Sequence, residues 1–285
     1  MQTKLRTGRP NDIAEGGHIL YEAFKTIATR HNFPPDFPSV EVASRLLADL
    51  LSRDDIHAVV AERDGRVVGS NFLWESDAIA GVGPITVDPG AQDEAVGRQL
   101  MSAVLKRAAE RKFVGVRLVQ AAYHNRSLAL YSKLGFDARE PLSLIQGPAP
   151  KRRTANRQVR PASVAELNEC NALAARILGY GRGGELHQAI NQGGAMVVEH
   201  DGHLSGYTTG IGFFGHAVAQ SNDDLIALIA AAAEISGPGL LLPTRNATVL
   251  RWCLEHGLRI VQPMTLMSMG EYVEPSGAWL PSILY

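Results

Sequence analysis

The sequence predicts an α/β protein made of two tandem domains of similar plan. Three observations carry this prediction: the length of 285 residues, a pattern of strands and helices that recurs in both halves, and a basic, proline-containing segment between them. One domain usually takes about 100–200 residues, so the chain is long enough for two hydrophobic cores. We expect domains at residues 1–147 and 158–285, joined by a linker at 148–157.

The repeat is clearest at a hairpin in each half. Residues 58–69 (AVVAERDGRVVG) match residues 195–206 (AMVVEHDGHLSG), and each copy is typical of two strands joined by an Asp-Gly turn. Both halves then end with a strand, a short loop, a helix, a glycine and a further strand. Gly135 and Gly257 stand where a left-handed residue is expected to end that helix.

Composition excludes several classes of protein. The net charge is −1, so no global basic field would attract nucleic acid or an anionic membrane. The two cysteines, Cys170 and Cys253, are too few for a disulfide framework or a thiolate metal site, and we expect no metal. The first residues lack the apolar core of a secretion signal, and the most apolar stretch (225–235) is too short to span a bilayer. These features favour a soluble, cytoplasmic protein.

The most informative segment is the loop between a strand ending at Val87 and a helix beginning near Val96. The helix has an apolar face at Val96, Leu100, Met101, Val104, Leu105 and Ala108. Unpaired N–H groups at a helix start favour an anion, small residues at Ala95 and Gly97 let a phosphate approach, and Arg98 adds a positive charge. Taken alone, the segment is equally consistent with an ordinary connection.

The second half lacks this loop. There the strand after Gly215 passes directly into a helix whose start carries Asp223 and Asp224. Acidic residues cap a helix well at that position but repel a phosphate. We therefore expect only the first half to bind the ligand.

Two motifs carry a family resemblance. The first is Val87-Asp88-Pro89 followed by residues 92–97 (QDEAVG), and the second is the complete pattern of residues 125–136 (NRSLALYSKLGF). Together they resemble the GNAT superfamily of acetyl-CoA-dependent N-acyltransferases, over residues 4–145 and, as a degenerate copy, over residues 158–272. Ala95 replaces the first glycine of the loop motif, a change that is tolerated if Ala95 keeps a negative φ.

The resemblance implies a fold and an activity. Each domain would be a mixed, largely antiparallel, twisted sheet flanked by helices. The first would transfer an acetyl group from acetyl-CoA to a primary amine of a small molecule or peptide, through a tetrahedral intermediate, with no nucleic acid or membrane as partner. The oligomeric state stays open, a homodimer among the alternatives.

It also implies roles for individual residues. Tyr131 would be the general acid toward the leaving thiolate, and the Val87 backbone would donate to the thioester carbonyl. The residues that would bind coenzyme A are Ile85, Thr86, Val87, Gln92, Asp93, Glu94, Ala95, Val96, Gly97, Arg98, Asn125, Ser127 and Tyr131. From periodicity alone Tyr131 is a core aromatic, and Asn125 is equally suited to cap its helix.

Three questions stay open at this point. No carboxylate lies on residues 81–86, so the general base is either a loop residue (Glu75, Asp77, His31, Asp36 or His124) or a chain of water molecules. The aromatic and proline loop at 31–38 either walls an acceptor site or packs on the surface, and the apolar tail at 275–285 packs on a domain or reaches a partner. A non-catalytic acyl-CoA sensor is the alternative function, and a module that docks a protein partner is a third.

Overall fold

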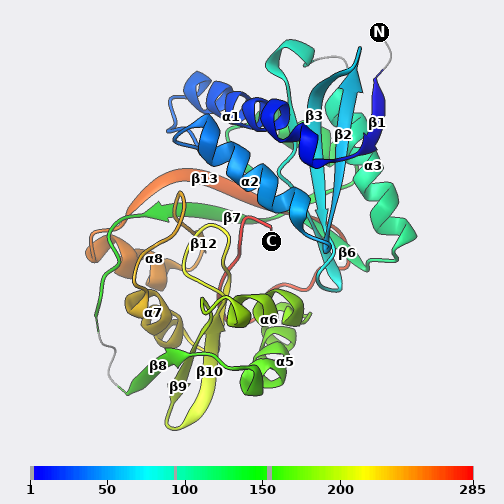
Figure 1. Ribbon diagram of the computed structural model, residues 1–285. Coiled ribbons are helices and arrows are strands. Elements are labelled where there is room, and N and C mark those ends of the chain that lie inside the picture. Colours follow the sequence, from blue (N-terminus) through cyan, green and yellow to red (C-terminus); the bar gives the residue numbers. More distant parts are fainter. Residues whose placement is uncertain (1–2, 93–94, 153–155, 285) are drawn as a thin grey trace. The chain divides into compact units, whose positions relative to one another are not determined.

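The computed structural model describes residues 3–92, 95–152 and 156–284 (Figure 1). By its internal contacts the chain divides into two compact units. Unit 1 holds Met1–Leu118 and His124–Leu134, and unit 2 holds Val119–Tyr123 and Gly135–Tyr285. The two units therefore interleave along the chain near residue 120.

Unit 1 contains both strands and helices. Its elements are β1 (Lys4–Thr7), α1 (Ile13–Arg30), α2 (Val40–Ser52), β2 (Ile56–Arg63), β3 (Arg66–Trp74), β4 (Ile79–Val82), β5 (Thr86–Val87), α3 (Val96–Glu110), the first part of β6 (Gly115–Ala121) and α4 (Asn125–Lys133). The sheet has the order β1-β2-β3-β4-β6, in which β4 and β6 are parallel and the other neighbours are antiparallel. This is the mixed sheet that the sequence predicts.

The predicted hairpin is formed by β2 and β3. Its turn residues Asp64 and Gly65 have φ values of +51° and +78°, as a tight two-residue turn of this hand requires. After its first residue β3 is buried throughout, because α1 and α3 both pack on it (Figure 1). The second copy repeats the turn at Asp201 and Gly202, with φ values of +50° and +77°.

The strand that leads to the predicted ligand loop changes partners along its length. Its first part, β4, pairs with β3 and with β6. After Gly83 and Pro84 it continues as β5, which within the described residues pairs with β3 alone. One side of β5 is thus left without a strand partner.

Unit 2 contains the remaining elements. They are the end of β6, β7 (Asp137–Gln146), β8 (Arg157–Pro161), α5 (Leu167–Leu178), α6 (Gly183–Asn191), β9 (Met196–His200), β10 (His203–Thr208), β11 (Ala217–Ala219), α7 (Asn222–Ala231), β12 (Leu240–Pro243), α8 (Ala247–Glu255), β13 (Arg259–Gly270) and β14 (Ala278–Leu280). One sheet has the antiparallel order β14-β11-β10-β9-β8.

In the other sheet of unit 2, β7 lies between β12 and β13 and is antiparallel to both. β13 lies in turn beside the end of β6, where the Ala122 N–H donates to the Pro263 carbonyl at 3.0 Å. β7 precedes the linker expected at 148–157, whereas β12 and β13 follow it. Residues from both sides of that segment therefore build one sheet.

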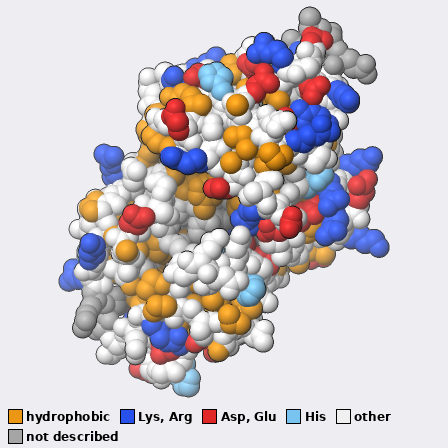
Figure 2. Space-filling model, in the orientation of Figure 1, with side chains coloured by type: hydrophobic (Ala, Val, Ile, Leu, Met, Phe, Trp, Pro, Cys, Tyr) orange, Lys and Arg blue, Asp and Glu red, His pale blue; other side chains and the backbone are white. Residues whose placement is uncertain are grey.

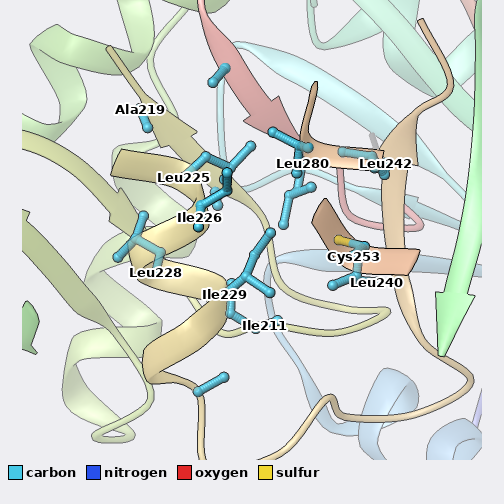
Figure 3. Packing of buried hydrophobic residues seen from close by; sticks show 14 of the residues in the cluster. Ile211, Ala219, Leu225, Ile226, Leu228, Ile229, Leu240, Leu242, Cys253 and Leu280 are labelled. Atoms are coloured by element: carbon cyan, nitrogen blue, oxygen red, sulfur yellow. The ribbon is translucent and has the colours of Figure 1, made fainter. Parts of the chain in front are cut away.

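The core of unit 2 surrounds α7. Leu225–Ala230 are all buried, and their side chains pack among those of β12, α8 and β14 (Figure 3). A helix that is apolar on every side belongs inside a core, which accounts for the apolar stretch at 225–235. The tail packs on unit 2, because β14 pairs with β11 and its residues are buried. Among the described helices, none is both long enough and apolar enough to cross a membrane.

The helix after the ligand loop, α3, has the predicted apolar face. Val96, Leu100, Met101, Val104 and Ala108 are buried, and Leu105 is half-buried. Ala95, before this helix, does not meet the condition of a negative φ, since it has φ +63° and ψ +9°, in the left-handed region. An alanine Cβ is strained in this conformation, at a cost of about 1–2 kcal/mol.

Unit 2 also buries a charged cluster. Glu185 Oε2 lies 2.5 Å from Arg182 Nη2 and 3.0 Å from Nδ1 of His216. The other ring nitrogen of His216, Nε2, lies 3.0 Å from the Tyr207 hydroxyl. His216 is fully buried, and burial, with the positive charge of Arg182, lowers its pKa to about 4. Burial alone would raise the pKa of Glu185, but Arg182 and the His216 hydrogen bond bring it well below its usual range.

The strain at Ala95 gives a first prediction. Ala95→Gly should raise the free energy of unfolding by about 1 kcal/mol, because glycine adopts this φ without a steric penalty and is also better tolerated at a helix N-cap. Ala109→Gly, on the exposed face of α3, should lower it by about 1 kcal/mol. Urea titrations of both variants measure the two changes. A loss of stability in Ala95→Gly would contradict the assignment of strain.

The buried cluster gives a second prediction. Because the pKa of folded His216 lies below the unfolded value of about 6.5, the unfolded chain binds more protons between those values. The contribution of His216 to the free energy of unfolding should be complete above pH 6.5. It should fall by on the order of 3 kcal/mol as the pH drops toward 4. The melting temperature should change less with pH across this range in His216→Gln than in wild type. The exposed control His203→Gln should keep the wild-type slope, and parallel curves for all three proteins would refute the assignment.

Candidate active site

The end of β5 presents a free backbone edge. Asp88 N–H donates to the Val68 carbonyl at 2.9 Å, and Val87 lies opposite Gly69. This register makes Gly69 and Val87 a non-hydrogen-bonded pair, so the N–H and C=O of Val87 point away from β3. Thr86 is buried, with its hydroxyl 3.2 Å from that of Ser70, and Ile85 before it is half-buried. Val87 can therefore donate a backbone hydrogen bond on the side where β5 has no strand partner among the described residues.

The start of α3 lies next to this edge. A Cβ added at Gly97 would lie 3.7 Å from a side-chain carbon of Val87 and 3.7 Å from one of Leu130 on α4. Those are ordinary contact distances, so packing does not require glycine here. The three elements β5, α3 and α4 thus meet at Gly97.

No side chain of the described residues caps the first turn of α3, and that turn carries no acidic residue. Its N–H groups, including those of Val96, Gly97 and Arg98, are therefore available to an anion. Arg98 is exposed at this end. Gln92 Oε1 accepts a hydrogen bond from Arg126 at 3.4 Å, which ties the loop to the start of α4. Asp93 and Glu94 lie outside the described residues.

The start of α4 differs by one residue from the expected capping. The helix begins at Asn125, and His124 occupies the N-cap, with its carbonyl accepting from the Leu128 N–H at 3.1 Å. Asn125 is exposed in the first turn, so it is not the cap. At the other end Gly135 has φ +98°, which confirms the predicted left-handed residue after the helix.

Tyr131 is the buried side chain of α4, with 5% of its surface exposed. Burial raises the pKa of its phenol to about 12, against a hydrogen bond from Ser127 that favours the ionised form. The phenol is thus fully protonated at neutral pH. Both interpretations of the sequence, a core aromatic and a proton donor, are compatible with this placement.

A connection that the sequence analysis missed joins Tyr131 to His124. Ser127 Oγ lies 2.7 Å from His124 Nδ1 and is also hydrogen bonded to the Tyr131 phenol. Burial, with Arg126, His31 and Arg30 nearby, lowers the pKa of His124 to about 4, so the imidazole is neutral at pH 7. The signal was present in the spacing, because positions separated by three and four residues share one helix face.

The other candidates for the general base are either ion-paired or at least partly exposed. Glu75 lies 2.7 Å from Arg107 and 3.6 Å from Arg111, and hydrogen bonding to Arg107 lowers the pKa of its carboxyl. An ion-paired carboxylate is a poor proton acceptor, so Glu75 is structural. His31 is exposed, and Asp36 and Asp77 are partly exposed.

The second copy has a different helix start. Ser221 caps α7, its hydroxyl accepting from the Asp224 N–H at 3.2 Å, and Asp223 and Asp224 stand in the first turn. At the position matching Tyr131, Cys253 is buried on α8, and burial raises the pKa of its thiol to about 12. The features gathered at α3 and α4 are not repeated at α7 and α8.

The surface carries charges of both signs. On the face shown in Figure 2, Lys and Arg side chains are interspersed with Asp and Glu rather than separated from them. This face offers no extended basic field of the kind that nucleic-acid binding uses.

Comparisons with known proteins identify a family for the first part of the chain. The model of the acetyltransferase (GNAT) family matches residues 20–136, which include β5, α3 and α4. An IAA acetyltransferase from Azospirillum brasilense is 33% identical over 112 residues, which are 38% of this chain and 72% of that protein. A mycothiol acetyltransferase from Thermomonospora curvata is 35% identical over 94 residues, 32% of this chain, and the match spans only 31% of that relative's length.

Solved structures extend the likeness to the whole fold. A Pyrococcus horikoshii protein assigned as an acetyltransferase has a TM-score of 0.74 at 18% identity, over 96% of this chain and 91% of that one. A tandem GNAT protein from the clavulanic acid biosynthesis pathway has a TM-score of 0.57 at 15% identity, over 96% of this chain and 100% of that one. At these identities the likeness concerns the fold. Because the family model matches residues 20–136 and a relative that is 33% identical is matched over 72% of its length, the chain belongs to the GNAT family of acetyltransferases.

Proposed function

We propose that this protein transfers an acetyl group from acetyl-CoA to a primary amine of a small molecule or peptide. The observation that carries the proposal is the meeting of three features at Gly97: an uncapped helix start, a strand end with a free N–H, and a helix bearing a buried phenol. Each meets a separate need of acetyl transfer: binding a pyrophosphate, polarising a thioester and protonating a thiolate.

The start of α3 would hold the pyrophosphate. Its first-turn N–H groups and helix dipole favour negative charge, and Arg98 adds a cation. Glycine at position 97 is not needed for packing, so its small size is best explained by a ligand that approaches the backbone there. Gln92, Asn125 and Ser127 would contact the rest of coenzyme A from the loop and from α4.

The Val87 backbone would serve the reacting carbonyl. Bound acetyl-CoA supplies an activated acyl group, whose carbonyl oxygen gains negative charge when an amine attacks. A backbone donor fixed by strand pairing needs no reorganisation to stabilise that charge, and one such donor is typically worth about 10²–10³ in rate. Thr86 and Ile85 position this donor, because the Thr86 hydroxyl is fixed against Ser70.

Tyr131 would protonate the departing sulfur. With a pKa of about 12 its phenol holds its proton at neutral pH and gives it up only to a stronger base. An alkyl thiolate is a weaker base in water but gains strength where solvent is excluded. The amine nitrogen loses one proton, and the sulfur takes one from Tyr131.

Calorimetry with acetyl-CoA and with free CoA tests the binding step. Wild type should bind both, and Gly97→Ala should weaken binding at least about tenfold, equivalent to about 1.4 kcal/mol, because the added methyl group stands where the pyrophosphate approaches. The melting temperature of this variant should not fall, since the methyl group has room. Ser102→Ala, exposed on α3, is the matched control. Unchanged affinity in Gly97→Ala would remove the ligand from this helix start.

Tyr131→Phe tests the chemical step. Loss of a general acid typically costs about 10²–10⁴ in rate, so thiol release over a panel of amines should fall by that order while affinity for acetyl-CoA is retained. Ser132→Ala, exposed on the same helix, should release thiol at the wild-type rate. Wild-type binding with no thiol release for any amine would instead identify a sensor. Equal rates in Tyr131→Phe and wild type would exclude the phenol from the mechanism.

A further inference from the structure

We propose that His124 and Ser127 form a proton path that returns a proton from solvent to Tyr131 during each turnover. The inference rests on the proposed acetyl transfer and adds two residues to it. Its observation is a continuous line of hydrogen bonds along one face of α4, from the buried Tyr131 phenol through the Ser127 hydroxyl to Nδ1 of His124, 2.7 Å from Ser127.

The need for such a path follows from burial. Tyr131 is 5% exposed, so after it protonates the leaving sulfur its phenolate stands in a site that strongly disfavours the charge. Ser127 and His124 are both half-buried, and they link the phenol to the less enclosed end of the helix. A hydroxyl both accepts and donates, so Ser127 can pass a proton on without holding a charge.

The imidazole is suited to the outer end of the path. Burial, with Arg126, His31 and Arg30 nearby, keeps His124 neutral at pH 7, and a neutral imidazole has one donor and one acceptor nitrogen. It therefore takes a proton at one nitrogen only while releasing another. An imidazolium with the ordinary pKa would hold its proton more firmly.

The proton balance closes as follows. In the starting state the Nδ1–H of His124 donates to Ser127 Oγ. When Tyr131 has given its proton to the sulfur, the Ser127 proton moves to the phenolate oxygen, the Nδ1 proton moves to Ser127, and Nε2 takes a proton from water. The amine nitrogen releases one proton to solvent, so no net proton is consumed. Tautomer exchange at the imidazole restores the Nδ1–H form.

The sequence offers a natural contrast in the second copy. The residues matching His124, Ser127 and Tyr131 there are Asn246, Val249 and Cys253, which cannot form the same line. Asn246 instead caps α8, its side-chain oxygen accepting from the Val249 N–H at 3.3 Å. Helix capping at this position thus does not require histidine, and an imidazole at 124 calls for a separate explanation.

The test measures thiol release over many turnovers at saturating acetyl-CoA with the most reactive amine of the panel, because every turnover after the first needs Tyr131 to regain its proton. Ser127→Ala and His124→Gln should each slow release about tenfold or more at saturating acetyl-CoA, within the range of proton-transfer catalysis, and His124→Gln should leave the affinity for acetyl-CoA little changed. Ser127→Thr, which keeps the hydroxyl, should restore most of the rate. Ser132→Ala and His18→Gln, both exposed, are the matched controls.

Two further readouts separate a proton path from simple positioning. In mixtures of H₂O and D₂O the wild-type rate should depend on the deuterium fraction in a curve that indicates several protons in motion, and Ser127→Ala should give a straight line. In the Tyr131→Phe background, His124→Gln should have no further effect. The proton path would be overturned if His124→Gln slowed wild type and Tyr131→Phe equally, or if Ser127→Ala and His124→Gln both kept the wild-type rate. Either result would leave the proposed acetyl transfer intact. No thiol release by wild type would instead overturn the proposed function.

Discussion

The site depends on the strand that changes partners between Val82 and Thr86. If β5 continued beside β6 as β4 does, the N–H of Val87 would be used within the sheet. Because β5 pairs with β3 alone in the described chain, that N–H faces outward, and the start of α3 follows within a short loop. Backbone groups that sheet pairing and helix geometry leave unused thereby come together, and in the proposed acetyl transfer the proton donor would come from a side chain.

Much of this arrangement could be predicted because its determinants are local. The Asp-Gly turns and the glycine after α4 each need a positive φ that few other residues supply, and they occur as predicted. The apolar face of α3 follows from helical periodicity in the same way. The left-handed Ala95 was not predictable on these grounds, since the surrounding loop overrides the preference of alanine. The shift of the N-cap from Asn125 to His124 falls within the uncertainty of helix ends, yet it is what brings an imidazole onto the face of Tyr131.

The two copies share a framework and differ at the positions where the proposed chemistry would take place. Both retain the hairpin and a helix ended by a left-handed glycine, features that serve folding. In the second copy the helix start is capped by Ser221 and carries acidic residues, and a buried thiol of high pKa replaces the phenol. These changes improve a helix end and a core, which is the direction expected once no ligand has to be accommodated. At a helix start, capping and acidic residues stabilise the helix, whereas an uncapped start without acidic residues can bind an anion.

The placement of β7 bears on how the protein can be made. Its two neighbours, β12 and β13, are encoded after the 148–157 segment, so during synthesis β7 leaves the ribosome long before either of them. Until then both of its edges lack the strands that will cover them, and uncovered edges are sites of misassociation. The second half of the chain is thus needed to finish the sheet that the first half starts.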